Sequence, residues 1–376
     1  MDLQTAKRAL EFHVGHRSAT LPKASPKNVA LGHLFFAGLK PTVHAARLAD
    51  RLLYPAYQQQ EVHAPVLVFA NARSGTTLFH HLLSLDTERF APMKLYQTVF
   101  PSVTLQRLID AGIAVDARLG RPLKRLVDHS DAYFFQAWDG IHGTGLQQLE
   151  EDETLFVYQF LSPGLMFLYP DFERFQRALF LDKADAATRR RVMAFVRDSM
   201  QRHLYQAGGR RTLLNKSIWY PPRILSTLEA FPDTRFVYMM RHPYETIPSF
   251  LNFFYAAWQV FYPGLKRDAV PVHALAQLAI DYYRHVQDHK HRVPQAQWHS
   301  IEFRDFIADP RAAVEGCYDF YGWTLPQDVR ARIDKTLEGR DRFKSRQRYT
   351  LEDFGLSRAF VAEQLADVFE AHGYAA

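Results

Sequence analysis

The stretch VLVFANARSGTTLFHHLLSLD, residues 66–86, sets the expectation for the whole fold. It begins with a nearly continuous apolar run, as does a strand that is buried on both faces of a sheet. A short polar turn follows, and the apolar side chains after it recur at helical spacing. A strand, a tight turn and a helix N-terminus together form an anion site, because the free amides of the first helical turn point outward. The stretch therefore predicts an anionic ligand at residues 71–77.

The turn differs from a Walker loop, which has the pattern G-x-x-x-x-G-K-[ST] and a lysine that reaches the outer phosphates. Ala70 stands at the first glycine position, Gly75 at the second, and Thr76 where the lysine belongs. The cation is instead Arg73, ahead of the glycine. The hydroxyl groups that can donate to an anion are those of Ser74, Thr76 and Thr77. Such a turn can hold a terminal phosphate-like group without ATP–magnesium chemistry, and an ordinary βα turn without a ligand stays open as the alternative.

Three further runs have the composition of strands, and helical segments separate them. They are RTLLN at 211–215, TRFVYMMR at 234–241 and WHSIEFRDF from residue 298. Strands that alternate with helices predict a parallel sheet flanked by helices. The intervals of about 87–210 and 251–295 are expected to be helical insertions. The fold class that follows is α/β, with a P-loop-like parallel sheet.

A chain of 376 residues can form one α/β domain with insertions. We expect an N-terminal cap of short helices at 1–63, the main domain at 64–356 and a C-terminal helix at 357–376. Hydrophobic residues make up 47% of the chain and aromatic residues 14%, which suffices for a core and an apolar pocket. The single cysteine, Cys317, excludes an intrachain disulfide and is expected to be a small core or helix residue.

The formal charge of +6 and the pI near 9.2 favour anionic partners: nucleic acid, an anionic membrane or a phosphorylated small molecule. The sequence contains no recognition helix or aromatic stacking sheet, so we expect no nucleic-acid surface. It has neither a signal-peptide pattern nor an apolar run long enough to span a bilayer, which favours a cytoplasmic location. No spacing of histidine, cysteine or carboxylate residues in the sequence indicates a metal site. The sequence does not determine the oligomeric state.

A second anion site is predicted where the strand at 234–241 ends. Arg241 lies at its carboxyl end, the edge at which open α/β sheets bind ligands. His-Pro then ends the strand, and a helical segment from near Tyr244 carries Ser249. A guanidinium with a hydroxyl suits a second phosphate, although an arginine at a strand end can instead pair with a carboxylate.

Together, RSGTTLFHHLLSLD and FPDTRFVYMMRHPYETIPS resemble the two cofactor motifs of sulfotransferases that use 3′-phosphoadenosine 5′-phosphosulfate (PAPS). The likeness is greatest to the bacterial sulfotransferase-3 family and extends from about Pro65 to Gly355. It implies the sulfotransferase fold, PAPS as donor, the desulfated nucleotide PAP as product, and transfer without a metal ion. By this resemblance the 5′-phosphosulfate is held by Arg73, Ser74, Gly75, Thr76 and Thr77. The 3′-phosphate is held by Arg241 and Ser249.

The segment GRDRFKSRQRYT, residues 339–350, carries a cation at every second position. In an extended conformation these cations would share one side, because successive side chains of a strand alternate. The resemblance implies a loop near here that closes over the 3′-phosphate, with Arg346 and Arg348 as the candidate ligands. A solvated charge run is the alternative.

Sulfuryl transfer should resemble phosphoryl transfer, in which alignment and charge stabilisation supply the catalysis. Lys216, at the end of RTLLNK, is the expected donor to the sulfuryl or bridging oxygen, and the resemblance supports it; a surface lysine is the alternative. Related cytosolic sulfotransferases have a histidine base two residues further on, where this chain has Ile218. Our candidate bases are Glu151, in the acidic run 150–153, and His142, in the loop DGIHGTG.

These observations favour an enzyme that moves a sulfuryl group from PAPS to a hydroxyl of a fairly apolar small molecule, with an amine as the less favoured acceptor. The aromatic region at 133–175 is the expected acceptor pocket. Two alternatives stay open: an ATP-using phosphotransferase on the same loop, and a nucleotide-binding protein that has lost its proton acceptor.

Overall fold

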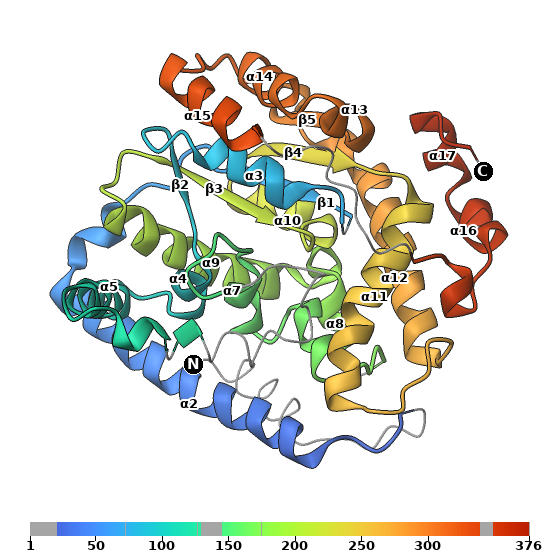
Figure 1. The fold of residues 1–376 in the computed structure, drawn as a ribbon, viewed down its shortest axis with the longest axis horizontal. Helices are drawn as coiled ribbons and strands as arrows, with labels where there is room; N and C mark the ends of the chain where they lie inside the picture. Colours follow the sequence, from blue (N-terminus) through green and yellow to red (C-terminus); the bar gives the residue numbers. More distant parts are fainter. Residues whose placement is uncertain are drawn as a thin grey trace.

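A five-stranded parallel sheet lies at the centre of the computed structural model, in the order β2-β3-β1-β4-β5 (Figure 1). The structure describes residues 21–71, 73–125, 127–128, 145–173, 175–338 and 349–375. The strands are β1 (Val66–Ala70), β2 (Phe90–Pro92), β3 (Thr212–Ser217), β4 (Arg235–Met240) and β5 (Trp298–Glu302). The predicted α/β fold with a parallel sheet is confirmed.

Both faces of the sheet are covered, which explains why β1 is apolar throughout. Leu67 and Phe69 pack into one hydrophobic cluster, and Val66, Val68 and Ala70 pack into another on the opposite face. The helices that supply the second cluster are α3 (Thr76–Ser84), α13 (Phe303–Ala308), α14 (Pro310–Phe320) and α15 (Gln327–Leu337). They form the upper layer in Figure 1.

The larger cluster lies on the other face, beneath the sheet in Figure 1. Its main helices are α7 (Glu153–Val157), α8 (Gln176–Leu179), α9 (Ala186–Gln206), α10 (Ile224–Ala230), α11 (Pro243–Phe261) and α12 (Val270–His289). Two short helices, α16 (Arg358–Gln364) and α17 (Ala366–His372), stand where one C-terminal helix was expected. Among the described residues, the interval 87–210 contains α4 (Leu95–Val99), α5 (Val103–Arg118), α7, α8 and α9 as well as the strand β2, and 251–295 contains most of α11 and all of α12. The proposed domain boundaries remain a prediction.

The strand β2 was not predicted. It lies inside the interval expected to be helical, has only three residues and includes Pro92. A proline lacks the amide that a central strand needs, but β2 is an edge strand and pairs only with β3. A segment this short carries too little periodicity for the sequence to indicate a strand.

The N-terminal region also differs from expectation. Residues Pro26–Leu53 form one long helix, α2, rather than several short ones, and Pro41 lies inside it. A 3-10 turn at Pro55–Gln59 follows. Next to α2 lies α5 (Val103–Arg118), with α4 (Leu95–Val99) just before it in the chain. Because tertiary packing holds α2, a single proline does not end it.

Cys317 lies in α14 as a buried free thiol, as expected, and burial raises its pKa to about 12. Within the described ranges, no helix combines the length and the apolar character that crossing a bilayer requires.

Candidate functional site

The turn before α3 has two residues with a positive φ, Arg73 and Gly75. Gly75 is the N-cap of α3 and adopts a left-handed conformation with φ of 80°. A Cβ atom there would lie 3.0 Å from ring carbons of both Phe303 and Phe306. Arg73 also has a positive φ, of 70°, which costs a non-glycine residue free energy. The turn is therefore held in a defined shape, with the first amides of α3 left without helical partners.

The hydroxyl groups of the turn have different surroundings. Ser74 is fully buried, and its hydroxyl donates a 2.7 Å hydrogen bond to the carbonyl of Asn71. The Asn71 amide in turn donates to the Tyr238 hydroxyl at 2.9 Å. Thr76 is buried and Thr77 is exposed. The side chain of Ser74 thus ties the turn together.

Arg241 lies directly against the turn. Its guanidinium donates a hydrogen bond to the carbonyl of Arg73 and stacks on the ring of Phe303, 4.1 Å from the centroid. Burial, followed by the charge of Arg241, lowers the pKa of Arg73. The two arginines that the sequence placed in separate motifs therefore meet at one edge of the sheet.

The remaining contacts of Arg241 favour an exchangeable site. Its Nε donates to the carboxylate of Glu245 at 2.7 Å, and that side chain is 56% exposed. An ion pair this exposed contributes at most about 1 kcal/mol, so an incoming anion can replace the carboxylate. Ser249 is half-buried on α11, one helical turn beyond Glu245 and on the same side of the helix.

Lys216 lies in β3 and is fully buried, so the alternative of a surface lysine is wrong. Its Nζ donates to the Glu150 carboxylate at 3.3 Å and lies 3.7 Å from that of Glu151. In the sheet, Lys216 pairs with Val68, so its side chain lies two residues before the end of β1. Lys216 is the penultimate residue of β3, which runs parallel to β1, so the lysine and the anion turn both lie toward the carboxyl ends of these strands.

The four acids of residues 150–153 fall into two pairs with different contacts. Asp152 is buried and accepts hydrogen bonds from Tyr220 and Asn215, and burial raises its pKa to about 6. The carboxylate of Glu153 accepts two bonds from the Arg223 guanidinium, at 2.6 and 2.8 Å. These two acids fix α7 onto the core.

Glu150 and Glu151 instead contact Lys216. The Glu151 side chain is 17% exposed, whereas that of Glu150 is 7% exposed. Burial lowers the pKa of Arg73, and the charge of Glu151 raises it by less. Glu151 therefore lies close to both Lys216 and Arg73. Glu151 was a candidate base from the sequence, and that role stays a prediction. The contact of Glu150 with Lys216 was not predicted, because neighbouring acids in a run look alike until the fold orients them.

Three predicted residues, His142, Arg346 and Arg348, lie outside the described residues. Ile218 lines a small hollow together with Asn71, Thr246 and Phe250. Much of the described part of the predicted acceptor pocket is core, with Leu155, Phe156, Leu161, Leu165 and Met166 all buried. Aromatic residues at helical spacing there mainly serve packing.

No cluster of three or more histidine, cysteine or carboxylate side chains suited to a metal occurs among the residues that the structure describes. His80, beside Lys216, is fully buried, and burial together with the charge of the lysine lowers its pKa to about 3. It is therefore neutral at physiological pH.

Comparison with known proteins identifies relatives of the chain. The model of the sulfotransferase family matches residues 65–327. Omega-hydroxy-beta-dihydromenaquinone-9 sulfotransferase Stf3 of Mycobacterium tuberculosis is 24% identical over 324 residues, which cover 82% of this chain and 75% of the relative. The protein of the same name from Mycobacterium bovis matches equally well.

Solved structures have the same fold. The sulfotransferase STF9 of Mycobacterium avium superposes with a TM-score of 0.76 at 17% identity, covering 100% of this chain and 93% of its own. The sulfotransferase STF1 of Mycobacterium tuberculosis gives a TM-score of 0.72 at 18% identity, covering 97% of this chain and 91% of its own.

Proposed function

The chain belongs to the sulfotransferase family and is a sulfotransferase, and on that premise we propose that it moves the sulfuryl group of PAPS to a hydroxyl of an apolar small molecule. One observation carries the proposal: Arg73, Arg241 and Lys216 converge at the carboxyl edge of the sheet, beside the free amides of α3. This arrangement suits a ligand with two anionic ends.

The proposed donor site has two parts. The turn from Arg73 to Thr77 would hold the 5′-phosphosulfate, chiefly through the backbone amides and the Arg73 guanidinium, since the Ser74 hydroxyl is bonded within the turn. Arg241 and Ser249 would hold the 3′-phosphate, which replaces Glu245 at the guanidinium. Arg346 and Arg348 remain candidates for the loop that closes over it.

The proposed chemistry uses the residues around Lys216. Bound PAPS supplies the sulfuryl group and a phosphate leaving group. Lys216 is a buried cation that can stabilise the negative charge developing on the transferred group. The carboxylate of Glu151 lies 3.7 Å from the Lys216 Nζ and is only partly exposed, so it is placed to accept the proton of an acceptor hydroxyl bound next to the lysine. His142 remains the competing base.

An apolar acceptor is supported by a relative. The Mycobacterium relative is named as a sulfotransferase of omega-hydroxy-beta-dihydromenaquinone-9, a menaquinone-derived molecule with a hydroxyl group. By analogy we propose an apolar acceptor that presents a hydroxyl to Glu151 and Lys216. The family assignment and Thr76 in place of the Walker lysine argue against an ATP-using phosphotransferase, and the family assignment argues against an inactive binding protein.

The proposal is tested with radiolabelled PAPS and a panel of apolar alcohols, including a hydroxylated quinone, together with calorimetric titration of PAP. Transfer to at least one alcohol without added metal ions, and binding of PAP that is lost in Arg73→Ala, is the expected result. Absence of both transfer and PAP binding in the folded wild-type protein would contradict it.

A further inference from the structure

Exposed apolar side chains gather on two neighbouring segments of this chain. Of the fourteen large hydrophobic residues exposed in the described structure, eleven lie on α2, on α5 or on the residues up to 125 that follow α5. Those on α2 are Leu31, Leu34, Phe35, Leu48, Leu52 and Leu53. Those on residues 103–125 are Leu108, Ile113, Val115, Leu119 and Leu123. Single exposed leucines are ordinary, but a concentration of this kind marks an interaction surface.

The outer face of α2 has an unusual pattern for a surface helix. Uncharged, mostly apolar residues recur along it in alternating steps of three and four, and all of them are exposed: Leu31, Leu34, Gly38, Pro41, Ala45, Leu48 and Leu52. The inner face carries the buried apolar residues Leu39, Val43 and Ala46 beside the buried charges of Arg47 and Asp50. A helix on the surface of a soluble domain normally has an apolar side inward and a polar side outward, whereas α2 carries apolar residues on both sides.

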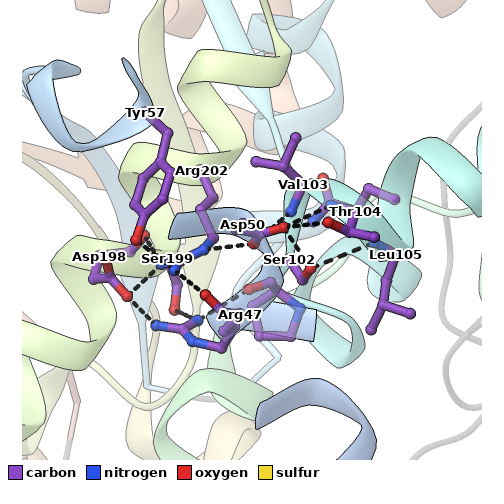
Figure 2. Close-up of polar contacts among 12 residues, drawn as sticks. Arg47, Asp50, Tyr57, Ser102, Val103, Thr104, Leu105, Asp198, Ser199 and Arg202 are labelled. Atoms are coloured by element: carbon purple, nitrogen blue, oxygen red, sulfur yellow. Dashed lines mark hydrogen bonds and ion pairs between the residues drawn. The ribbon is translucent and has the colours of Figure 1, made fainter. Parts of the chain in front are cut away.

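Figure 2 shows how this orientation is fixed. The carboxylate of Asp50 accepts a 2.8 Å hydrogen bond from Arg202 of α9 and bonds of 3.0 and 2.8 Å from the first amides of α5, at Val103 and Thr104. Arg47 pairs with Asp198 of α9 in the same network. The inner sides of α2 and α5 are thus bound to α9, and the two helices lie next to each other at an edge of the molecule away from the sheet (Figure 1). We call the exposed residues of α2 and of 103–125 together the α2–α5 face.

The charged side chains of the α2–α5 face are mainly positive. The exposed cations are Lys27, Arg51, Arg107, Arg118, Arg121, Lys124 and Arg125. The acids of 21–53 and 103–128 are Asp50, Asp110, Asp116 and Asp128. Asp50 and Asp116 are buried, Asp110 accepts hydrogen bonds from Tyr96 and Gln206, and Asp128 pairs with Lys124.

We propose that the α2–α5 face docks on a lipid bilayer that contains anionic headgroups. Leucine and phenylalanine side chains can enter the boundary between headgroups and acyl chains, while the surrounding lysines and arginines contact the lipid phosphates. A second copy of the chain is the poorer occupant, because cations outnumber acids across the α2–α5 face, so two copies of this face would repel each other. The inference goes beyond sulfuryl transfer and rests on this surface alone.

Cosedimentation with lipid vesicles tests the proposal. The wild-type protein is expected to bind vesicles of phosphatidylcholine mixed with phosphatidylglycerol and to bind pure phosphatidylcholine vesicles more weakly. The variant Leu34→Asp/Leu52→Asp should lose at least about tenfold in affinity for both kinds. The variant Arg118→Gln/Arg121→Gln/Arg125→Gln should lose about a hundredfold, but only with the anionic vesicles.

A matched control is available in Val270→Asp, since Val270 is 65% exposed at the start of α12 and lies outside the α2–α5 face. It should bind like the wild type, and all variants should keep the wild-type thermal unfolding midpoint. The proposal is overturned if the wild-type protein ignores anionic vesicles or if Val270→Asp weakens binding as much as the leucine variant does. It is also overturned if sedimentation velocity shows a dimer that Leu34→Asp/Leu52→Asp converts to monomers.

Discussion

Replacing Glu151 by glutamine removes the proposed proton acceptor while preserving the shape of the side chain. Glu150 still lies 3.3 Å from the Lys216 Nζ, so the buried lysine keeps a carboxylate partner. We therefore expect the free energy of unfolding to change by less than about 2 kcal/mol. General base catalysis contributes roughly 10²–10⁴-fold to a rate, and kcat should fall by that factor.

The matched variant is Glu150→Gln, which alters the neighbouring acid that contacts the same lysine. Because Glu150 is the more buried of the two and positions Lys216, we expect its kcat to fall by less than about tenfold. Initial rates at saturating PAPS and calorimetric titration of PAP measure the two effects separately. PAP should bind to both variants within about threefold of the wild-type affinity, since proton transfer plays no part in binding.

The pH profile of kcat/KM separates a base from a structural residue. In the wild type the rate should fall on the acidic side as the base is protonated, and Glu151→Gln should lack this limb. The reasoning is refuted if Glu151→Gln keeps a kcat within threefold of the wild type, or if Glu150→Gln alone shows the large loss. Retention of the acidic limb in Glu151→Gln would assign the proton to another group, with His142 the next to be replaced.

Three further outcomes concern the stability of the fold. Gly75→Ala places a Cβ at a positive φ and 3.0 Å from two phenylalanine rings, so it should destabilise the fold by about 1–3 kcal/mol and weaken PAP binding, measured by thermal unfolding and calorimetry. Burial raises the pKa of Asp152 to about 6, so between pH 4 and 6 the folded state keeps a proton that the unfolded state has released. The free energy of unfolding should therefore fall by about 2–3 kcal/mol as the pH rises from 4 to 6 because of this group, and Asp152→Asn should flatten that slope in urea unfolding. Asp50→Asn breaks a fully buried pair with Arg202 and should cost about 3–5 kcal/mol, whereas Arg332→Gln, which breaks an exposed pair with Asp328, should cost less than about 1 kcal/mol.

The parts of the site that follow strands were predictable from the sequence. β1 and β4 are apolar runs long enough to identify, and parallel strands end at the same edge, so the meeting of Arg73 with Arg241 follows from two local patterns and one topological rule. Lys216 was predictable for the same reason, as a residue at the end of β3.

Other features required the folded chain. Nothing in the run EEDE distinguishes the acid that meets Lys216 from the one that meets Arg223, because partners come from elements about seventy residues away. Phe303 was missed as well: its ring supports both Gly75 and Arg241, yet in the sequence it is one phenylalanine among 29. The length of α2 depends on packing that overrides Pro41.

The central claim is that two cationic positions hold opposite ends of one nucleotide, and calorimetry with two ligands tests it directly. PAP carries both a 3′-phosphate and a 5′-phosphate, whereas AMP carries only the 5′-phosphate. Arg73→Ala should weaken both ligands about ten- to a hundredfold, as loss of a charge-assisted hydrogen bond requires. Arg241→Ala should weaken PAP by a similar factor and leave AMP within about twofold of the wild type. Equal losses for PAP and AMP in Arg241→Ala, or no loss for either, would contradict the account.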